Sequence, residues 1–187
     1  MIRQRRSDGP PVVRAVAEAL PFADAAFDAV FALFTIHHWS DVARGFDGLE
    51  RVAPLRIFLT WNREVHWKYW LFEEYLPEIP EAARGLPAED DITRRFPGSC
   101  VEVVPVAWDC TDGFCTSYWR RPEMYLDPSA RAAMSPLARL APHVVERAMR
   151  RLRDDLESGA WERRHSDLID TESLDCGLSL VISSGTH

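Results

Sequence analysis

Two adjacent histidines, His37 and His38, are the residues of this chain whose types and position best suit catalysis. An unperturbed imidazole titrates near pH ~6.5, so either ring could serve as a general base at neutral pH. An alternative is that one ring caps the next helix or packs in the core while the other is solvated. Side chains of adjacent residues in a strand point to opposite faces, so the pair is poorly placed to bind a metal together. We therefore expect no metal site.

The elements around this pair predict a βαβ unit. Phe27–Phe34 is an apolar run of strand length, interrupted only by Asp28, and such a continuous run is typical of a parallel strand covered on both faces. Ser40 is the expected N-cap of a helix that ends near Arg51, and Leu55–Trp61 is the next strand. Ligands bind outside the carboxyl ends of parallel strands, which is where the two histidines fall.

The remaining pattern is less regular. The expected elements are a strand at Val12–Val16, mostly loop over Pro77–Pro97, a strand at Val101–Trp108, a helix from Pro142 with Gly159 as its C-cap, and a strand at Leu174–Ser183. An aromatic helical face contains Trp67, Tyr69, Trp70, Phe72 and Tyr75. We interpret this face as core or, with Trp61 and Asn62, as the wall of a pocket for a small molecule.

Composition restricts the class of partner. The chain has 187 residues and a net charge of −7, with no basic run beyond Arg3–Arg6. This argues against nucleic acid or an anionic membrane surface as the main partner. The sequence has neither the apolar run of a signal peptide nor an 18-residue apolar stretch, and the spacing of its four cysteines is not that of a metal site. We expect a cytoplasmic protein with free thiols.

Three short motifs resemble, in their order and spacing, a pattern of small-molecule methyltransferases. They are Glu18-Ala19-Leu20-Pro21-Phe22, Phe27-Asp28-Ala29-Val30 and His37-His38-Trp39. The similarity is to class I S-adenosylmethionine-dependent methyltransferases of type 11, and it is most specific over Val12–Trp61. It implies an α/β fold with an incomplete Rossmann-like sheet, mostly parallel, and a helical insertion. It also implies a single truncated domain over 1–187, with residues 1–62 as the remaining cofactor half, 63–160 as insertion, lid and helices, and 161–187 as a closing strand.

The resemblance implies S-adenosylmethionine as cofactor and a small molecule as methyl acceptor. By its motifs, Ala17 and Glu18 contact the adenine, and Phe34 and Thr35 flank the sulfonium. His37 or His38 is the implied base.

The glycine-rich turn of the family and the strands that neighbour Val12–Val16 have no counterpart in this sequence. A start upstream of Met1, a fragment and a rearranged core are the alternatives left open. We expect the isolated chain to bind the cofactor weakly or not at all. Missing strands also expose a sheet edge, so the second hypothesis is a non-enzymatic binding or dimerisation module that pairs as a homodimer. A nicotinamide-dependent enzyme is disfavoured because no Gly-x-Gly-x-x-Gly cluster is present.

Overall fold

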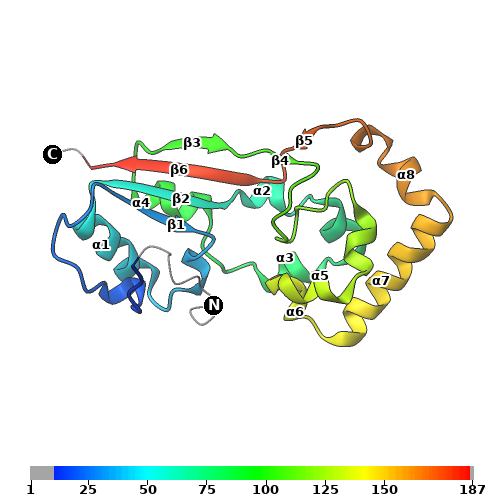
Figure 1. The fold of residues 1–187 in the computed structure, drawn as a ribbon, viewed down its shortest axis with the longest axis horizontal. Helices are drawn as coiled ribbons and strands as arrows, with labels where there is room; N and C mark the ends of the chain where they lie inside the picture. The colour runs from blue at the N-terminus through cyan, green and yellow to red at the C-terminus, as the bar shows by residue number, and fades with distance from the viewer. Residues whose placement is uncertain (1–10, 186–187) are drawn as a thin grey trace.

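A four-stranded sheet forms one end of the molecule and a group of short helices forms the other (Figure 1). The computed structural model describes residues 11–185. The strand order is β1 (Ala29–Leu33), β2 (Leu55–Trp61), β6 (Leu178–Ser184) and β3 (Cys100–Val103). Strand β1 is parallel to β2, and β6 is antiparallel to both of its neighbours, so β1, β2 and β3 run in one direction. The predicted α/β fold with a mostly parallel sheet is confirmed.

The predicted βαβ unit is present as β1, α1 (Val42–Val52) and β2. The N-cap of α1 is Asp41, whose carboxylate accepts the backbone N–H of Arg44 at 3.0 Å. The expected N-cap Ser40 is therefore wrong by one residue. Ser40 instead donates its hydroxyl to Glu18, because the carboxylate of Glu18 lies against the start of the helix.

Helices α1 and α4 (Glu89–Arg95) cover one face of the sheet. Their buried side chains Phe46, Leu49, Ile92 and Phe96 pack on Ala32, Phe58 and Val181 of the strands. The Phe46 and Phe58 rings meet edge to face, with centroids 5.8 Å apart. Burial of these rings fixes which side of each strand faces inward.

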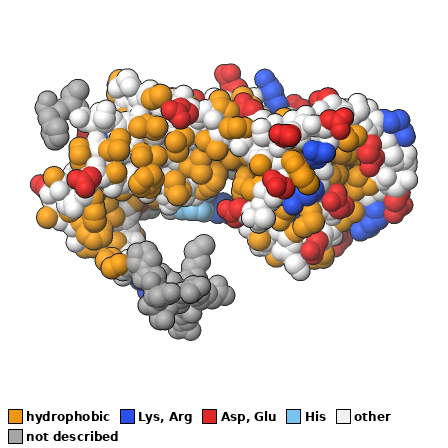
Figure 2. Space-filling view, turned by 45° about the horizontal axis from the view of Figure 1, so that its top comes forward, with side chains coloured by type: hydrophobic (Ala, Val, Ile, Leu, Met, Phe, Trp, Pro, Cys, Tyr) orange, Lys and Arg blue, Asp and Glu red, His pale blue; other side chains and the backbone are white. Residues whose placement is uncertain are grey.

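The opposite face of the sheet is largely open, so the expectation that Phe27–Phe34 is covered on both faces is wrong. Residues paired in register lie on the same face, which gives one row through Phe31, Ile57 and Ile182 and another through Leu33, Leu59 and Leu180. Phe31 is 61% exposed and Leu33 is 53% exposed, and the other four are half-buried. We call these six residues the open sheet face. Figure 2 shows hydrophobic side chains gathered over the sheet end of the molecule.

Four element predictions are wrong. The expected strand Leu174–Ser183 is divided into β5 (Ser173–Leu174) and β6, which belong to different sheets, because the chain turns at Gly177 with a left-handed φ of 73°. Residues 12–16 form no strand, because they pair with no strand of the described sheet. Pro77–Pro97 is not mostly loop but contains α3 (Glu78–Ala82) and α4. The expected strand Val101–Trp108 is divided into β3 and β4 (Val106–Ala107), because Pro105 has no N–H to continue the pairing, and β4 pairs with β5 (Ser173–Leu174) instead.

The helical end is built from short segments around an aromatic core. These are α2 (Arg63–His66), a π-helical turn (Leu71–Tyr75), α5 (Pro128–Ala133), α6 (Ser135–Ala138), α7 (Pro142–Glu157) and α8 (Ala160–Arg164), with 3₁₀ turns at Pro122–Leu126 and Ser166–Leu168. Helix α7 ends at Glu157 with Ser158 as its C-cap, so the expected C-cap Gly159 is wrong by one residue; Gly159 follows the cap with a left-handed φ of 67°. Tyr69, Trp70 and Tyr75 are buried in this core. Among residues 11–185, no helix has both the length and the apolar character needed to cross a bilayer.

Candidate functional site

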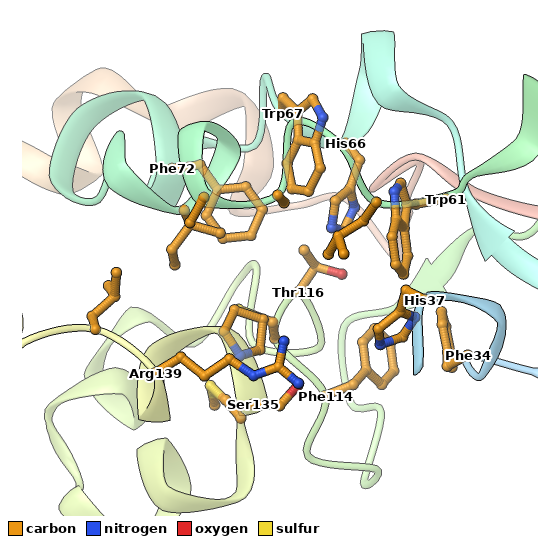
Figure 3. A pocket seen from close by; sticks show the side chains of 18 of the residues that line it. Phe34, His37, Trp61, His66, Trp67, Phe72, Phe114, Thr116, Ser135 and Arg139 are labelled. Carbon is orange, nitrogen blue, oxygen red and sulfur yellow. The ribbon is translucent and has the colours of Figure 1, made fainter. Parts of the chain in front are cut away.

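A cavity of about 300 Å³ lies between the carboxyl ends of β1 and β2 and the helical end of the molecule (Figure 3). Its walls carry many aromatic rings, so we call it the aromatic cavity. The lining residues with rings or polar groups are Phe34, His37, His38, Trp61, His66, Trp67, Phe72, Phe114, Thr116, Ser135 and Arg139. No carboxylate belongs to the described lining.

His37 and His38 both line this cavity. They lie in a 3₁₀ turn, Ile36–His38, rather than in a strand, and their ring centroids are only 3.9 Å apart. The expectation that their side chains point to opposite faces is therefore wrong, since the tight turn replaces strand geometry at these residues. The His37 ring also contacts Trp61, with centroids 4.8 Å apart.

His37 is a neutral imidazole at physiological pH. Burial, with smaller contributions from the nearby His38 and Arg139 charges, lowers the pKa of His37 to about 4. Its Nδ1 atom is buried and has no hydrogen-bond partner among the described residues. An unpaired imidazole nitrogen in a cavity wall can form a hydrogen bond with a ligand that enters the cavity.

Phe34 connects β1 to the histidine turn in a strained conformation. Its φ of 48° lies in the left-handed region, which is uncommon for a bulky residue. Its backbone N–H still donates to Leu59 O at 2.9 Å, and its ring faces that of Phe114, with centroids 6.1 Å apart. Strain of this kind costs roughly 1–3 kcal/mol and tends to occur at functional sites.

His66 is a site residue that sequence reasoning missed. Its Nδ1 lies 2.8 Å from the carbonyl oxygen of Cys176. A carbonyl only accepts hydrogen bonds, so the neutral ring carries its proton on Nδ1 and leaves the lone pair on Nε2. Burial lowers the pKa of His66, and the bond to Cys176 opposes this effect. The only signal in the sequence was its position one turn after the strand that ends at Trp61.

The segment Cys176–Gly177 holds His66 in place. Asn62 caps α2 by accepting the N–H groups of Glu64 and Val65, and its own backbone N–H donates to Gly177 O at 2.8 Å. Gly177 has a φ of 73°, and a Cβ added there would lie 2.6 Å from the Cα of His66. Glycine is therefore required by both the conformation and the close approach of the two backbones.

Thr116 is the second site residue that sequence reasoning missed. It is fully buried, and its Oγ1 has no hydrogen-bond partner in the described structure. The preceding carbonyl, that of Cys115, accepts the hydroxyl of Tyr125 at 2.7 Å, and the Tyr125 oxygen in turn accepts the hydroxyl of Tyr69. These buried bonds fix the backbone that carries Thr116.

Of the four residues predicted to bind the cofactor, only Phe34 lines the aromatic cavity; Ala17, Glu18 and Thr35 do not. Oε1 of Glu18 accepts the backbone N–H of Ser40 at 2.7 Å and that of Asp41 at 3.0 Å. The Asp41 bond is the largest of the effects that lower the pKa of Glu18 to about 2. Ala17 is half-buried in the 3₁₀ turn Ala17–Ala19, which packs on α1.

Within residues 11–185, no group of three His, Cys, Asp or Glu side chains is arranged to hold a metal ion. All four cysteines are free thiols. The described polar groups of the cavity are imidazoles, hydroxyls and one guanidinium. They can bind a neutral ligand or accept a proton from it.

Comparison with known proteins agrees with this α/β fold. Residues 1–54 match a family model described as a methyltransferase domain. No curated protein matches the chain. The family-model match and the fold both support a resemblance to class I S-adenosylmethionine-dependent methyltransferases. The predicted resemblance is therefore confirmed.

One solved structure resembles the chain over almost its whole length. It is described as a candidate methyltransferase from an antibiotic biosynthesis pathway of Anabaena variabilis. It is 27% identical, with a TM-score of 0.86, and the match covers 98% of this chain and 77% of that chain.

Proposed function

We propose that the chain serves methyl transfer from S-adenosylmethionine to a small-molecule acceptor that occupies the aromatic cavity. The observation that carries the proposal is the meeting of Phe34, His37 and His38, at the end of β1, with Trp61 and His66 at the end of β2. A methyltransferase function in general is supported by the family match and by the Anabaena structure. A small-molecule acceptor agrees with the size and enclosure of the cavity.

The residues present fit part of a cofactor site. The strained Phe34 turns its ring into the cavity, and with Thr35 it would flank the sulfonium, since an aromatic face attracts a cation. Ala17 and Glu18 remain the proposed adenine contacts, although Oε1 of Glu18 already binds the start of α1. When bound, S-adenosylmethionine supplies an activated methyl group, so the chain's own task is to align the acceptor.

His37 and His38 are the proposed acid–base residues for an acceptor that loses a proton. The neutral His37 ring can accept a hydrogen bond without first losing a proton itself, which orients the acceptor group. His38, which is exposed, can pass a proton to solvent.

Cofactor binding by this chain is the direct test of the proposal. Isothermal titration calorimetry at high protein concentration should detect weak S-adenosylmethionine binding, and Phe34→Ala should weaken that binding several-fold because the ring beside the sulfonium is lost. Ile169→Ala, at an exposed residue of the helical end, is the control and should leave the affinity unchanged. Equal affinities for the chain and F34A would contradict the assignment of Phe34.

A second candidate function is a binding or dimerisation module without enzymatic activity. The open sheet face and the edge strand β1 favour it, because exposed apolar faces and unpaired strand edges are sites of association. The proposed partner is a second copy of the chain. A cytoplasmic location stays part of both proposals, and the four free thiols suit a reducing compartment.

A further inference from the structure

Besides His37 Nδ1 and Trp61 Nε1, two polar atoms in the wall of the aromatic cavity have no partner among the described residues. One is Oγ1 of Thr116, on a residue with no exposed surface. The other is Nε2 of His66, whose ring uses only Nδ1 in a hydrogen bond. Both side chains belong to the cavity lining, and Figure 3 shows them in the same part of the cavity. Leaving the buried Thr116 oxygen unpaired costs free energy, so a ligand that forms hydrogen bonds with both atoms gains affinity there.

The two atoms together match one hydroxyl group. His66 Nε2 can only accept, because the proton of the neutral ring is on Nδ1. The Thr116 hydroxyl can donate as well as accept. A ligand hydroxyl that donates to His66 can therefore accept from Thr116, and both protein atoms are then satisfied.

The remaining wall selects for a planar, uncharged ligand. Trp61 and His66 lie with their planes only 23° apart, and Trp67 and Phe72 continue the aromatic wall. The volume of about 300 Å³ corresponds to roughly ten water molecules at about 30 Å³ each, which is small for a ligand site. The described lining offers no carboxylate to a cation, and its one charged residue, Arg139, is exposed.

We propose that the aromatic cavity binds a neutral, planar aromatic molecule that carries a hydroxyl group, held by His66 Nε2 and Thr116 Oγ1. The statement that this molecule is the methyl acceptor rests on the proposed function. The statement that it binds in the cavity is independent of that function, because the residues that hold it are not among the predicted cofactor contacts.

The test compares 2-naphthol with naphthalene, which lacks the hydroxyl, by equilibrium dialysis against the whole chain without cofactor. Thr116→Val removes the unpaired oxygen while keeping the shape of the side chain. It should weaken 2-naphthol binding roughly fivefold, the usual effect of one hydrogen bond, and leave naphthalene binding unchanged. Its thermal unfolding temperature should not fall, because the hydroxyl has no protein partner to lose.

A matched control is available in the sheet. Thr60 is also buried with an unpaired Oγ1, but it does not line the cavity. Thr60→Val should leave the affinity for 2-naphthol unchanged. His66→Asn provides the second variant: its amide can still donate to Cys176 O, while the acceptor at Nε2 is lost. Both ligands lose contact with the ring, so 2-naphthol binding should weaken more than naphthalene binding.

The inference is overturned if the chain does not bind 2-naphthol up to its solubility limit. It is equally overturned if T116V and T60V change the affinity alike, or if T116V or H66N weakens naphthalene as much as 2-naphthol. If 2-naphthol discrimination is observed but S-adenosylmethionine does not bind, the inference is supported and the proposed methyl transfer is contradicted.

Discussion

At the scale of single residues, the neutral state of His37 makes the stability of the chain depend on pH. The pKa of His37 is about 4 in the folded chain, against an ordinary value of 6.5. Between these two values the unfolded chain binds more protons than the folded chain at this residue. The free energy of unfolding therefore falls as the pH is lowered from 6.5 towards 4.

His37→Gln should reduce this loss. The difference between the unfolding free energies at pH 7 and pH 5, measured by urea denaturation, should be smaller in H37Q than in the unchanged chain. Ile169→Gln, at an exposed residue of the helical end that carries no titratable group, is the control and should keep the full difference. The same pH dependence in H37Q and in the unchanged chain would show that the His37 ring is not held neutral by burial.

The residue types that follow the first strand correctly predicted the residues on one side of the cavity. Phe34, His37 and His38 follow β1 directly, so the sequence placed them together, and Trp61 and Trp67 were candidates for a pocket wall. His66 and Thr116 could not be found in this way. Their roles depend on a carbonyl of Cys176 and on an unpaired hydroxyl, and only the packed fold brings these atoms to the same cavity.

At the scale of elements, the turn before β6 positions the helix that carries His66. Gly177 donates its backbone N–H to the Asp175 carboxylate at 2.8 Å and accepts the N–H of Asn62 at 2.8 Å. The end of β2, the start of α2 and the start of β6 therefore meet at one glycine. We therefore expect a substitution at Gly177 to displace the backbone of His66 more than that of other residues.

Gly177→Ala should destabilise the chain by roughly 1–3 kcal/mol, because the new Cβ meets the backbone of His66 and the φ of 73° is strained for alanine. Urea denaturation measures the change, and the NMR signals of the His66 ring should move. Gly85→Ala is the matched control, since nothing lies within 4 Å of a Cβ at that residue. Equal stability of G177A and G85A would contradict the required close approach.

Helices and strands with a clear local hydrophobic pattern were predicted correctly. Elements that form only when another strand pairs with them were not. The apolar run of β1, the helix α1 and the apolar run of β2 each carry a local signal, so the βαβ unit was evident. Residues 12–16 have the β-branched composition of a strand, but a strand needs a hydrogen-bonded neighbour, and in the described structure these residues pair with none. Composition alone cannot report whether that neighbour is present.

At the scale of the whole molecule, the described helices cover only one of the two faces of the sheet. Helices α1 and α4 bury one face, whereas the open sheet face keeps Phe31 and Leu33 more than half exposed. Contiguous exposed apolar area of this kind usually marks an interaction site. All six residues of the open sheet face are uncharged. The charged side chain in register with them is Glu102 of β3, which pairs with Leu180 at the edge of the sheet opposite β1, so two copies can meet over β1 and β2 away from that carboxylate.

Phe31→Asp should therefore abolish self-association, because two carboxylates at the centre of a symmetric contact would lose water and repel each other. Sedimentation velocity over a concentration series should show a dimer of the unchanged chain and a monomer of F31D. Ile169→Asp adds the same charge at an exposed apolar residue of the helical end and should leave the dimer intact. An unchanged chain that stays monomeric at every concentration and also binds S-adenosylmethionine would defeat the dimerisation module and favour the enzyme. A dimer that F31D disrupts and that binds no cofactor would reverse that preference, since the open sheet face would then account for what the chain binds.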